Sequence, residues 1–461
     1  MVKLTTPDLV ETYRWNWHSI SQQSAFQTNC ELSVPRKHLT IEWRLSMLFS
    51  IIRMYKDKEA IMEHIHIKNF GPIIDAALEI KDLTVIYGTQ AAGKSVIAKL
   101  LKVFNSPDLV SSRDIKSTLQ NFNMDSYLHD DTYLKYVNGD RTAEYIGGVY
   151  KDSISNHKGY VFKRELFEQQ LTRSKGNPAI VALNMLLPSY YDEDNLNSII
   201  IDSNKLDIKD PDSMYDYLNT ELRKSLIRNK LSNKIYVPSE RNIFSLISDN
   251  IFSLSATNIP ACILNFGSLM EKSRNISNSQ KIPFIKGLRY LYESKIDNVE
   301  YNGCKIPLPH SASGFQSSIP LALVCNNESL SGDKHFLIEE PEQNLFPVTQ
   351  HLLVKYLTEK CLSRSNRLLV TTHSPYIISS FDNLIQAGNV GRITSDQKAL
   401  MKIIPKKQWI DINRVNAYFI DKGKCINMID DTYNSIDGKY LDQASDVIGT
   451  EHRKLLELEY S

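Results

Sequence analysis

The hydrophobic pattern of the chain becomes regular at the segment MEHIHIKNF, after a polar stretch without a clear period at residues 1–61. Ile65 and Ile67 alternate with polar neighbours there, which predicts a half-buried strand. The turn residues in NFGP separate this strand from two more predicted strands, at residues 73–80 and 83–87. We therefore expect a folded domain to begin with this segment, and we interpret the preceding residues as an N-terminal extension.

The third strand runs into a loop with two glycines and then into a predicted helix at residues 94–103, where large apolar residues recur at helical spacing. From residue 106 to 233 the pattern is more polar, and we interpret this range as a mostly helical insertion. Its strongest predicted helix lies at residues 210–231, and the segment LNSIIIDSNKLDIK is typical of a strand pair.

Strands and helices alternate in the rest of the chain. The expected elements are a strand in KIYVPSERN, helices at about 257–275 and 283–294, a hairpin turning at Asn302-Gly303, a helix after Ser313, a strand at 335–338, a helix at 348–359, a strand at 367–371, and small strands with a terminal helix at 408–461. This alternation implies a largely parallel sheet with helices on its faces.

Composition narrows the class of protein. The 461 residues are 42% hydrophobic and 23% charged with a net charge of +1, which is typical of a soluble globular protein and gives no support for one that coats nucleic acid. The six cysteines are scattered without a CxxC pair, so we expect a reducing, cytoplasmic location. The most apolar early run, RLSMLFSIIRM, is too short to span a membrane, so we expect a short amphipathic helix there and no membrane contact.

The loop after the third strand matches the pattern G-x-x-x-x-G-K-[ST]. Glycines let a backbone wrap closely around a phosphate with its N–H groups pointing inward, and the following helix directs its positive end to the same anion. The pattern predicts that Lys94 reaches the β- and γ-phosphates and that Ser95 holds Mg²⁺. A chance glycine-rich turn is disfavoured because a strand precedes the loop and a helix follows it. The predicted nucleotide-binding residues are Gly88, Thr89, Gln90, Ala91, Ala92, Gly93, Lys94 and Ser95.

Two carboxylates, Glu339 and Glu340, end the predicted strand in HFLIEEPEQNLFP. Ligands bind at the carboxyl ends of parallel strands, so we expect Glu339 to orient Mg²⁺ and Glu340 to act as the general base for an attacking water. His373 ends the next strand in LLVTTHSP, where it could hydrogen-bond the γ-phosphate or that water. Alone, these residues also fit a helix N-terminus with favourable acids and a structural histidine.

Another helix start that could take a phosphate lies in HSASGFQSSIP. Ser313 and Gly314 precede the predicted helix, and Gln316 is in its first turn. The same residues fit a capping box, in which Ser313 caps the helix and Gln316 returns a hydrogen bond. Both interpretations stay open.

These four motifs, in this order, resemble those of ABC-type ATPases of the SMC/Rad50/RecF group. IEEPE, followed by NLFP and Gln350, together with VPSER at residues 237–241, looks most like the OLD-like (AAA15) group, which includes ATPase subunits of anti-phage systems such as Septu (PtuA) and PARIS (AriA). The resemblance extends from Met62 to about Ser380. It implies an α/β P-loop NTPase fold, an ABC-type head with a mixed sheet plus the insertion.

The resemblance also implies domains and roles. It divides the chain into an ATPase lobe at 62–105, the insertion or lever at 106–233, an ATPase core at 234–407, and a structural or partner-binding tail at 408–461. Ser313, Gly314 and Gln316 become a signature that contacts the γ-phosphate held by another subunit, and His373 becomes the switch histidine. ATP and Mg²⁺ are the implied cofactors, and a homodimer or higher oligomer with ATP between two heads is the implied assembly.

Three departures from the group's pattern are visible. The signature reads SASGFQ rather than LSGGQ, and Gln120 is only a candidate for the lid glutamine. The tail lacks the ExxxG and DxD clusters of a nuclease domain, so a self-contained nuclease is disfavoured. We expect a defence ATPase that controls a separate effector, such as a nuclease or toxin. The alternative is a DNA-repair or recombination ATPase of the RecF/Rad50 type, which keeps contact with DNA open.

Overall fold

The computed structural model describes residues 62–156, 231, 233–246, 259–441 and 443–459, together with the single positions 164, 168 and 215. The described residues belong to one compact unit, Lys58–Ser461. The N-terminal extension, the expected amphipathic helix within it, the helix at 210–231 and the strand pair before it lie outside the described residues.

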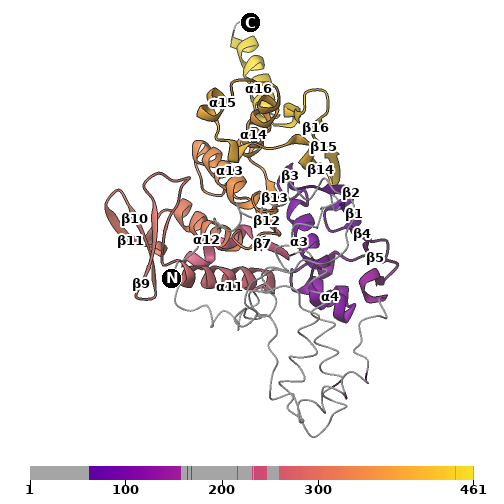
Figure 1. The fold of residues 1–461 in the computed structure, drawn as a ribbon. Helices are drawn as coiled ribbons and strands as arrows, with labels where there is room; N and C mark the ends of the chain where they lie inside the picture. The colour runs from indigo at the N-terminus through magenta and orange to yellow at the C-terminus, as the bar shows by residue number, and fades with distance from the viewer. Residues whose placement is uncertain are drawn as a thin grey trace, which may run out of the picture. The chain divides into compact units, whose positions relative to one another are not determined.

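Within the described ranges, eleven strands form one mixed sheet in the order β6-β5-β4-β1-β2-β15-β14-β3-β13-β12-β7 (Figure 1). These strands are β1 (Glu63–Phe70), β2 (Ile73–Ile80), β3 (Leu83–Gly88), β4 (Tyr133–Asn138), β5 (Arg141–Ile146), β6 (Val149–Asp152), β7 (Asn233–Val237), β12 (Lys334–Glu339), β13 (Arg367–Thr372), β14 (Val415–Asp421) and β15 (Lys424–Asn427).

The sheet has a parallel half and an antiparallel half. Strands β7, β12, β13, β3 and β14 pair in parallel, whereas β2, β1, β4, β5 and β6 pair antiparallel. The expected largely parallel sheet therefore describes only the half that carries the predicted site. Strand β15 joins the halves, antiparallel to β14 and parallel to β2.

Helices cover both faces of the parallel half (Figure 1). Val85, Ile338 and Val370 pack into the hydrophobic cluster that includes α12, α13 and α14, whereas Ile86 and Leu337 pack into the cluster that includes α3. The described helices are α3 (Lys94–Phe104), α4 (Pro107–Ser112), α5 (Ile115–Gln120), α10 (Ile243–Leu246), α11 (Ala261–Ile276), α12 (Ser313–Glu328), α13 (Pro347–Cys361), α14 (Pro375–Ile393), α15 (Gln397–Ile403) and α16 (Gln443–Glu459).

Apolar side chains on both faces explain why these strands lie at the centre. The segments LTVIY, HFLIE and RLLVTT are nearly continuous apolar runs, as parallel strands covered on both faces require. Strand β1 instead alternates, with Ile65 and Ile67 buried and the intervening histidines half-buried, which suits a sheet that is covered on one face.

The prediction of a helix at residues 283–294 is wrong. The segment forms strand β9 (Arg289–Glu293) in a second, four-stranded sheet with β8 (Ser279–Lys281), β10 (Ile296–Tyr301) and β11 (Cys304–Pro307). The buried hydroxyl of Tyr290 donates to Asp297 on β10, so cross-strand pairing decided the structure of a segment whose apolar spacing is ambiguous. The turn at Asn302-Gly303 is confirmed, with positive φ at both residues.

The described part of residues 106–233 differs from a mostly helical insertion. Besides α4 and α5 it contains β4, β5 and β6, which extend the antiparallel half of the main sheet. The pair of Arg141 and Asp152, with its closest oxygen 2.7 Å from Nη2, ties β5 to the end of β6, and Arg141 also donates to the carbonyl of Phe104 at the end of α3. The rest of the range lies outside the described residues.

The tail at 408–461 completes the sheet. Strand β14 lies beside β3 in the parallel half, and a small pair, β16 (Ile429–Asp430) and β17 (Ser435–Ile436), follows it. Strands followed by a terminal helix are as predicted, but the central place of β14 was not, because strand order depends on pairing between distant segments.

Candidate functional site

Four neighbouring parallel strands end at the same edge of the sheet. In the order β3, β13, β12 and β7, their carboxyl ends lead into the phosphate loop, the segment with His373, the acidic segment and the VPSER segment. Each segment lies far from the others in sequence. The parallel register therefore brings the predicted motifs to one edge, where ligands of parallel sheets bind.

The phosphate loop holds its lysine against its own backbone. Lys94 is 7% exposed, and its Nζ donates to the carbonyls of Gly88 at 2.8 Å and Thr89 at 2.7 Å. Burial lowers the pKa of Lys94, and nearby carboxylates, foremost that of Glu340, oppose the shift. The ammonium group is thus held among carboxylates and carbonyls.

Gly93 is required where the loop becomes a helix. It caps α3 with φ of 101°, in the left-handed region, and a Cβ there would lie 2.8 Å from Ile73 Cγ1. Ala91 also has positive φ, while Thr89 and Gln90 are exposed and Ala92 is buried. The loop therefore has the tight turn and the helix start that the pattern predicts.

Glu339 is buried at the end of β12. The hydroxyl of Tyr236 donates to its Oε1 at 2.8 Å, and Ser239 Oγ lies 3.5 Å from its Oε2. Burial raises the pKa of Glu339, while the charge of Lys99 and the hydroxyls of Tyr236 and Ser95 oppose the shift. Ser95 and Glu339, the two predicted metal ligands, are therefore neighbours.

Glu340 has an unusual backbone conformation. Its φ is +41°, which is uncommon for a residue with a Cβ. Its N–H donates to the carbonyl of Thr371 at 2.8 Å, and its carboxylate is partly exposed, with Oε1 3.4 Å from Nδ1 of His373. The predicted base and the predicted switch histidine are thus in contact.

A third carboxylate, Glu342, lies beneath His373. Its Oε1 accepts from Thr372 Oγ1 at 2.5 Å and from the N–H of His373 at 3.2 Å. Burial raises the pKa of Glu342. Its Oε2 has no hydrogen-bond partner among the described residues. Glu342 therefore fixes the backbone of His373, whose ring is exposed.

Arg241, from the η5 turn (Ser239–Asn242), is fully buried behind the acidic segment. Its guanidinium donates to the carbonyls of Pro238 at 3.1 Å, Glu339 at 2.8 Å, Glu340 at 2.7 Å and Ser317 at 3.0 Å. Burial lowers the pKa of Arg241 to about 10, so it stays charged at neutral pH.

The signature residues lie at the start of α12, which packs against the acidic segment. Gln316 Nε2 donates to the carbonyls of Pro309 and Ser311, and a Cβ on Gly314 would lie 2.8 Å from the carbonyl oxygen of Asn344. Ser313 is exposed. Helix α12 packs on α11, α13 and η5, whereas α3 packs on β3, β7, β12 and β13.

The capping-box interpretation of this helix start is wrong. The N-cap of α12 is Ala312, which makes no side-chain cap, and Ser313 is the first helical residue. Further along, Pro320 cannot donate to the carbonyl of Gln316, and the Ser245 hydroxyl donates to that oxygen at 2.6 Å instead. A contact from α10 thus satisfies the carbonyl that the internal proline leaves free.

The structure brings together Lys94, Ser95, Glu339, Glu340 and His373. Of the predicted signature residues, Gly314 packs against Asn344 of the acidic segment. Sequence reasoning missed the roles of three residues, namely Tyr236, Arg241 and Glu342. The sequence held a weak signal for two of them. Arg241 belongs to the VPSER segment at the end of β7, which pairs in parallel with the acidic strand β12, and Glu342 belongs to the same EEPE run as Glu339 and Glu340.

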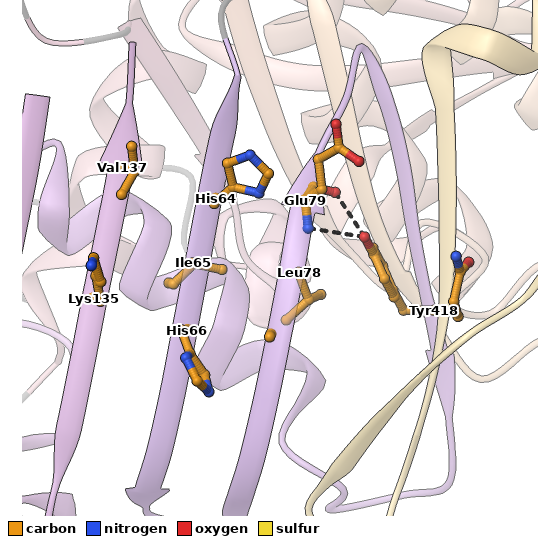
Figure 2. A pocket seen from close by; sticks show the side chains of 10 residues that line it. His64, Ile65, His66, Leu78, Glu79, Lys135, Val137 and Tyr418 are labelled. Carbon is orange, nitrogen blue, oxygen red and sulfur yellow. Dashed lines mark hydrogen bonds between the residues drawn. The ribbon is translucent and has the colours of Figure 1, made fainter. Parts of the chain in front are cut away.

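A depression of about 470 Å³ lies over β4, β1 and β2 of the antiparallel half and reaches β15 and β14 (Figure 2). His64, His66, Glu79, Lys135 and Tyr418 help to line it, and the Tyr418 hydroxyl bridges the backbone N–H and carbonyl of Glu79 at 2.9 and 3.0 Å. None of the predicted site residues lines it. It is the water-facing side of an antiparallel sheet, and we assign it no ligand.

No described helix has the length and apolarity needed to cross a membrane. In the same part of the chain, no cluster of three or more His, Cys, Asp or Glu side chains is arranged to hold a metal ion. The described cysteines, Cys262, Cys304, Cys325, Cys361 and Cys425, are free thiols.

Comparison with solved structures gives distant resemblances to SMC head domains. The SMC head bound to the C-winged helix domain of ScpA has a TM-score of 0.36 at 10% identity, covering 79% of this chain and 97% of that chain. The head with an extended coiled coil bound to the C-terminal domain of ScpA, derived from Pyrococcus furiosus, has a TM-score of 0.32 at 13% identity, covering 85% and 99%. The head from Thermotoga maritima has a TM-score of 0.34 at 10% identity, covering 79% and 97%. A comparison with curated proteins found no match.

The mixed sheet with helices on both faces and the phosphate loop define an α/β P-loop NTPase. Residues 108–378, more than half of the chain, match the profile of the AAA ATPase domain family (AAA_15), and the chain belongs to this family. The matched range contains the acidic strand and His373, and the phosphate loop precedes it. The protein is an ATPase.

Proposed function

We propose that the edge of the parallel strands is the site of ATP hydrolysis, with the roles predicted from the motifs. Lys94 and the N–H groups of residues 88–95 bind the phosphates, and Glu340 accepts a proton from the attacking water. His373 hydrogen-bonds that water or the γ-phosphate. The observation that carries this proposal is the 3.4 Å contact between Glu340 and His373 beside Lys94, which is held among carboxylates.

Ser95 and Glu339 fit a magnesium ion. Both offer hard oxygen donors, which Mg²⁺ prefers, and they lie side by side. Burial raises the pKa of Glu339, and a bound divalent cation would favour its ionised form. The ion would neutralise charge that develops on the phosphate oxygens.

We further propose that two copies of the chain share each nucleotide. Ser313 is exposed on a helix that packs away from α3, so a phosphate bound by one copy can be reached by the signature of another. Phe346, Val348 and Tyr376 are large apolar residues exposed at the starts of α13 and α14, next to the acidic segment and His373. A covering partner would remove their apolar surface from water.

Glu340→Gln tests both parts of this proposal. The variant should bind ATP, hydrolyse it about 10²- to 10⁴-fold more slowly, and accumulate as a nucleotide-bound dimer, because it loses only the proton acceptor. Turnover and size-exclusion chromatography with light scattering measure these effects. Glu451→Gln, an exposed glutamate on α16, is the matched control. Wild-type turnover in Glu340→Gln would show that another residue is the base.

For the biological role, we propose that this ATPase acts in the cytoplasm as the sensor of an anti-phage defence system and controls a separate effector. The support is the resemblance of its motifs to such subunits and its near-neutral charge. Co-purification from the native operon, followed by mass spectrometry, should recover a nuclease or toxin encoded beside it. Strong stimulation of ATP hydrolysis by DNA ends, without a bound effector, would favour the repair alternative.

A further inference from the structure

Arg241 is a buried charged residue with an unusual set of hydrogen-bond partners. It is 0% exposed, and its four described hydrogen bonds all go to main-chain carbonyls rather than to a carboxylate. Burying a guanidinium is costly unless each donor is well satisfied. A neutral side chain would fill the same space with a smaller desolvation penalty. We therefore expect that the charge of Arg241 serves to arrange the backbone around it.

Two of the four carbonyls that Arg241 binds belong to the predicted metal ligand Glu339 and the predicted base Glu340. Nη1 binds the carbonyl of Glu339 and Nη2 binds the carbonyl of Glu340, 2.8 and 2.7 Å away. Glu340 has its φ at +41°, a strained conformation that persists only where the surroundings enforce it. Its N–H is held by Thr371, so Arg241 supplies the second restraint on this residue.

The same guanidinium reaches the signature helix. Nε donates to the carbonyl of Ser317 at 3.0 Å, one turn after Gly314, and Ser317 Oγ donates to the carbonyl of Gln343 at 2.9 Å. Gly314 itself lies against Asn344. The planar fork of an arginine can bind three segments at fixed angles, which a lysine ammonium cannot do.

We propose that Arg241 is a positioning residue for ATP hydrolysis, which sets the conformation of Glu340 and ties it to the signature helix of the same chain. This inference rests on the proposed role of Glu340 as the base. It also proposes how the two are coupled. When the signature helix shifts on contact with a phosphate, Arg241 transmits the shift to Glu340 and changes its position. Arg241 touches neither nucleotide nor water in this proposal and acts through Glu340.

Arg241→Lys and Arg241→Met test the proposal. Arg241→Lys keeps the charge without the fork, and Arg241→Met keeps most of the volume without the charge. In both we expect kcat to fall about 10- to 100-fold, because a displacement of about 1 Å has that effect on a reacting group. The affinity for a fluorescent ATP analogue should stay within about twofold, since Arg241 lies behind the acidic segment and the phosphate loop is unchanged.

Two further readouts separate positioning from general damage. Amide hydrogen exchange at residues 339–345 should become faster in Arg241→Lys, while exchange at 334–338 stays the same. In the Glu340→Gln background, Arg241→Lys should cause little additional loss of kcat, because the residue acts through the base. Arg274→Lys, at a buried arginine paired with Asp297 in the second sheet region, is the matched control and should keep wild-type kcat.

The outcomes distinguish this inference from the proposed function. If Glu340→Gln alone keeps its turnover, the assignment of the base fails. If Glu340→Gln is slow but Arg241→Lys keeps wild-type kcat, or lowers kcat equally in both backgrounds, the positioning role is overturned. The arginine variant whose melting temperature is closer to wild type is used for the kinetics, and the exchange measurement needs only folded protein and no turnover.

Discussion

The buried carboxylates at the two ends of the same parallel strands have different surroundings. At the amino ends, Lys234 on β7, His335 on β12 and Arg367 on β13 surround Glu63, with Nζ of Lys234 2.6 Å from its Oε1 and Nη1 of Arg367 2.7 Å from its Oε2. At the carboxyl ends, the carboxylates of Glu339 and Glu342 are buried and accept hydrogen bonds from the hydroxyls of Tyr236 and Thr372.

The pKa directions show the same contrast. Burial alone would raise the pKa of Glu63, but Lys234 and Arg367 hold it below its ordinary value. Burial leaves the pKa of Glu339 and Glu342 raised. At the amino ends, cations of the protein thus oppose the effect of burial on the carboxylate, whereas at the carboxyl ends the effect of burial dominates. The first arrangement is typical of a stabilising cluster and the second of a reactive site.

Breaking the amino-end cluster should have the largest effect on stability. Glu63→Gln leaves buried Lys234 and half-buried Arg367 facing each other without a counter-charge, so we expect a loss of about 3–5 kcal/mol in the free energy of unfolding. Urea denaturation measures it. Glu144→Gln, a partly exposed strand glutamate, should lose less than about 1 kcal/mol. A similarly small loss in Glu63→Gln would refute the stabilising role.

Breaking the carboxyl-end site should affect activity instead. Lys94→Ala removes the cation that we propose contacts the phosphates, so ATP hydrolysis should fall by about 10²- to 10³-fold. The free energy of unfolding should change by less than about 1 kcal/mol, because the ammonium is buried against carbonyls rather than in an ion pair. Lys116→Ala, at an exposed lysine on α5, is the control. Full turnover in Lys94→Ala would contradict the assignment of the loop.

Acid should weaken the amino-end cluster by a smaller amount. The folded pKa of Glu63 lies below its ordinary value of 4.5, so its stabilisation is complete above pH 4.5 and is lost as the pH falls through the folded value. The difference in unfolding free energy between wild type and Glu63→Gln should therefore shrink below pH 4.5. Urea denaturation across pH 3–7 checks this, and a constant difference would mean that the pKa of Glu63 is the same in the folded and unfolded states.

Much of the fold was predictable because its patterns are local. Continuous apolar runs predicted β3, β12 and β13, and alternation predicted β1. Strand β9 was mistaken for a helix because its apolar residues fit both periods until Tyr290 meets Asp297 across the sheet. The strands β4, β5 and β6 were missed because β4 pairs with β1, from a different part of the chain, and β5 and β6 are added to the sheet through β4.

The sequence by itself determined that the phosphate loop, the acidic pair and the histidine lie at strand ends, because each prediction needs only a strand, a turn and a few residues in order. Only the tertiary structure decided that Glu342 supports His373, that Arg241 joins the acidic segment to the signature helix, and that Glu63 meets Lys234. Those contacts join residues far apart in sequence. They form only when parallel strands align, and spacing along one segment carries no information about that alignment.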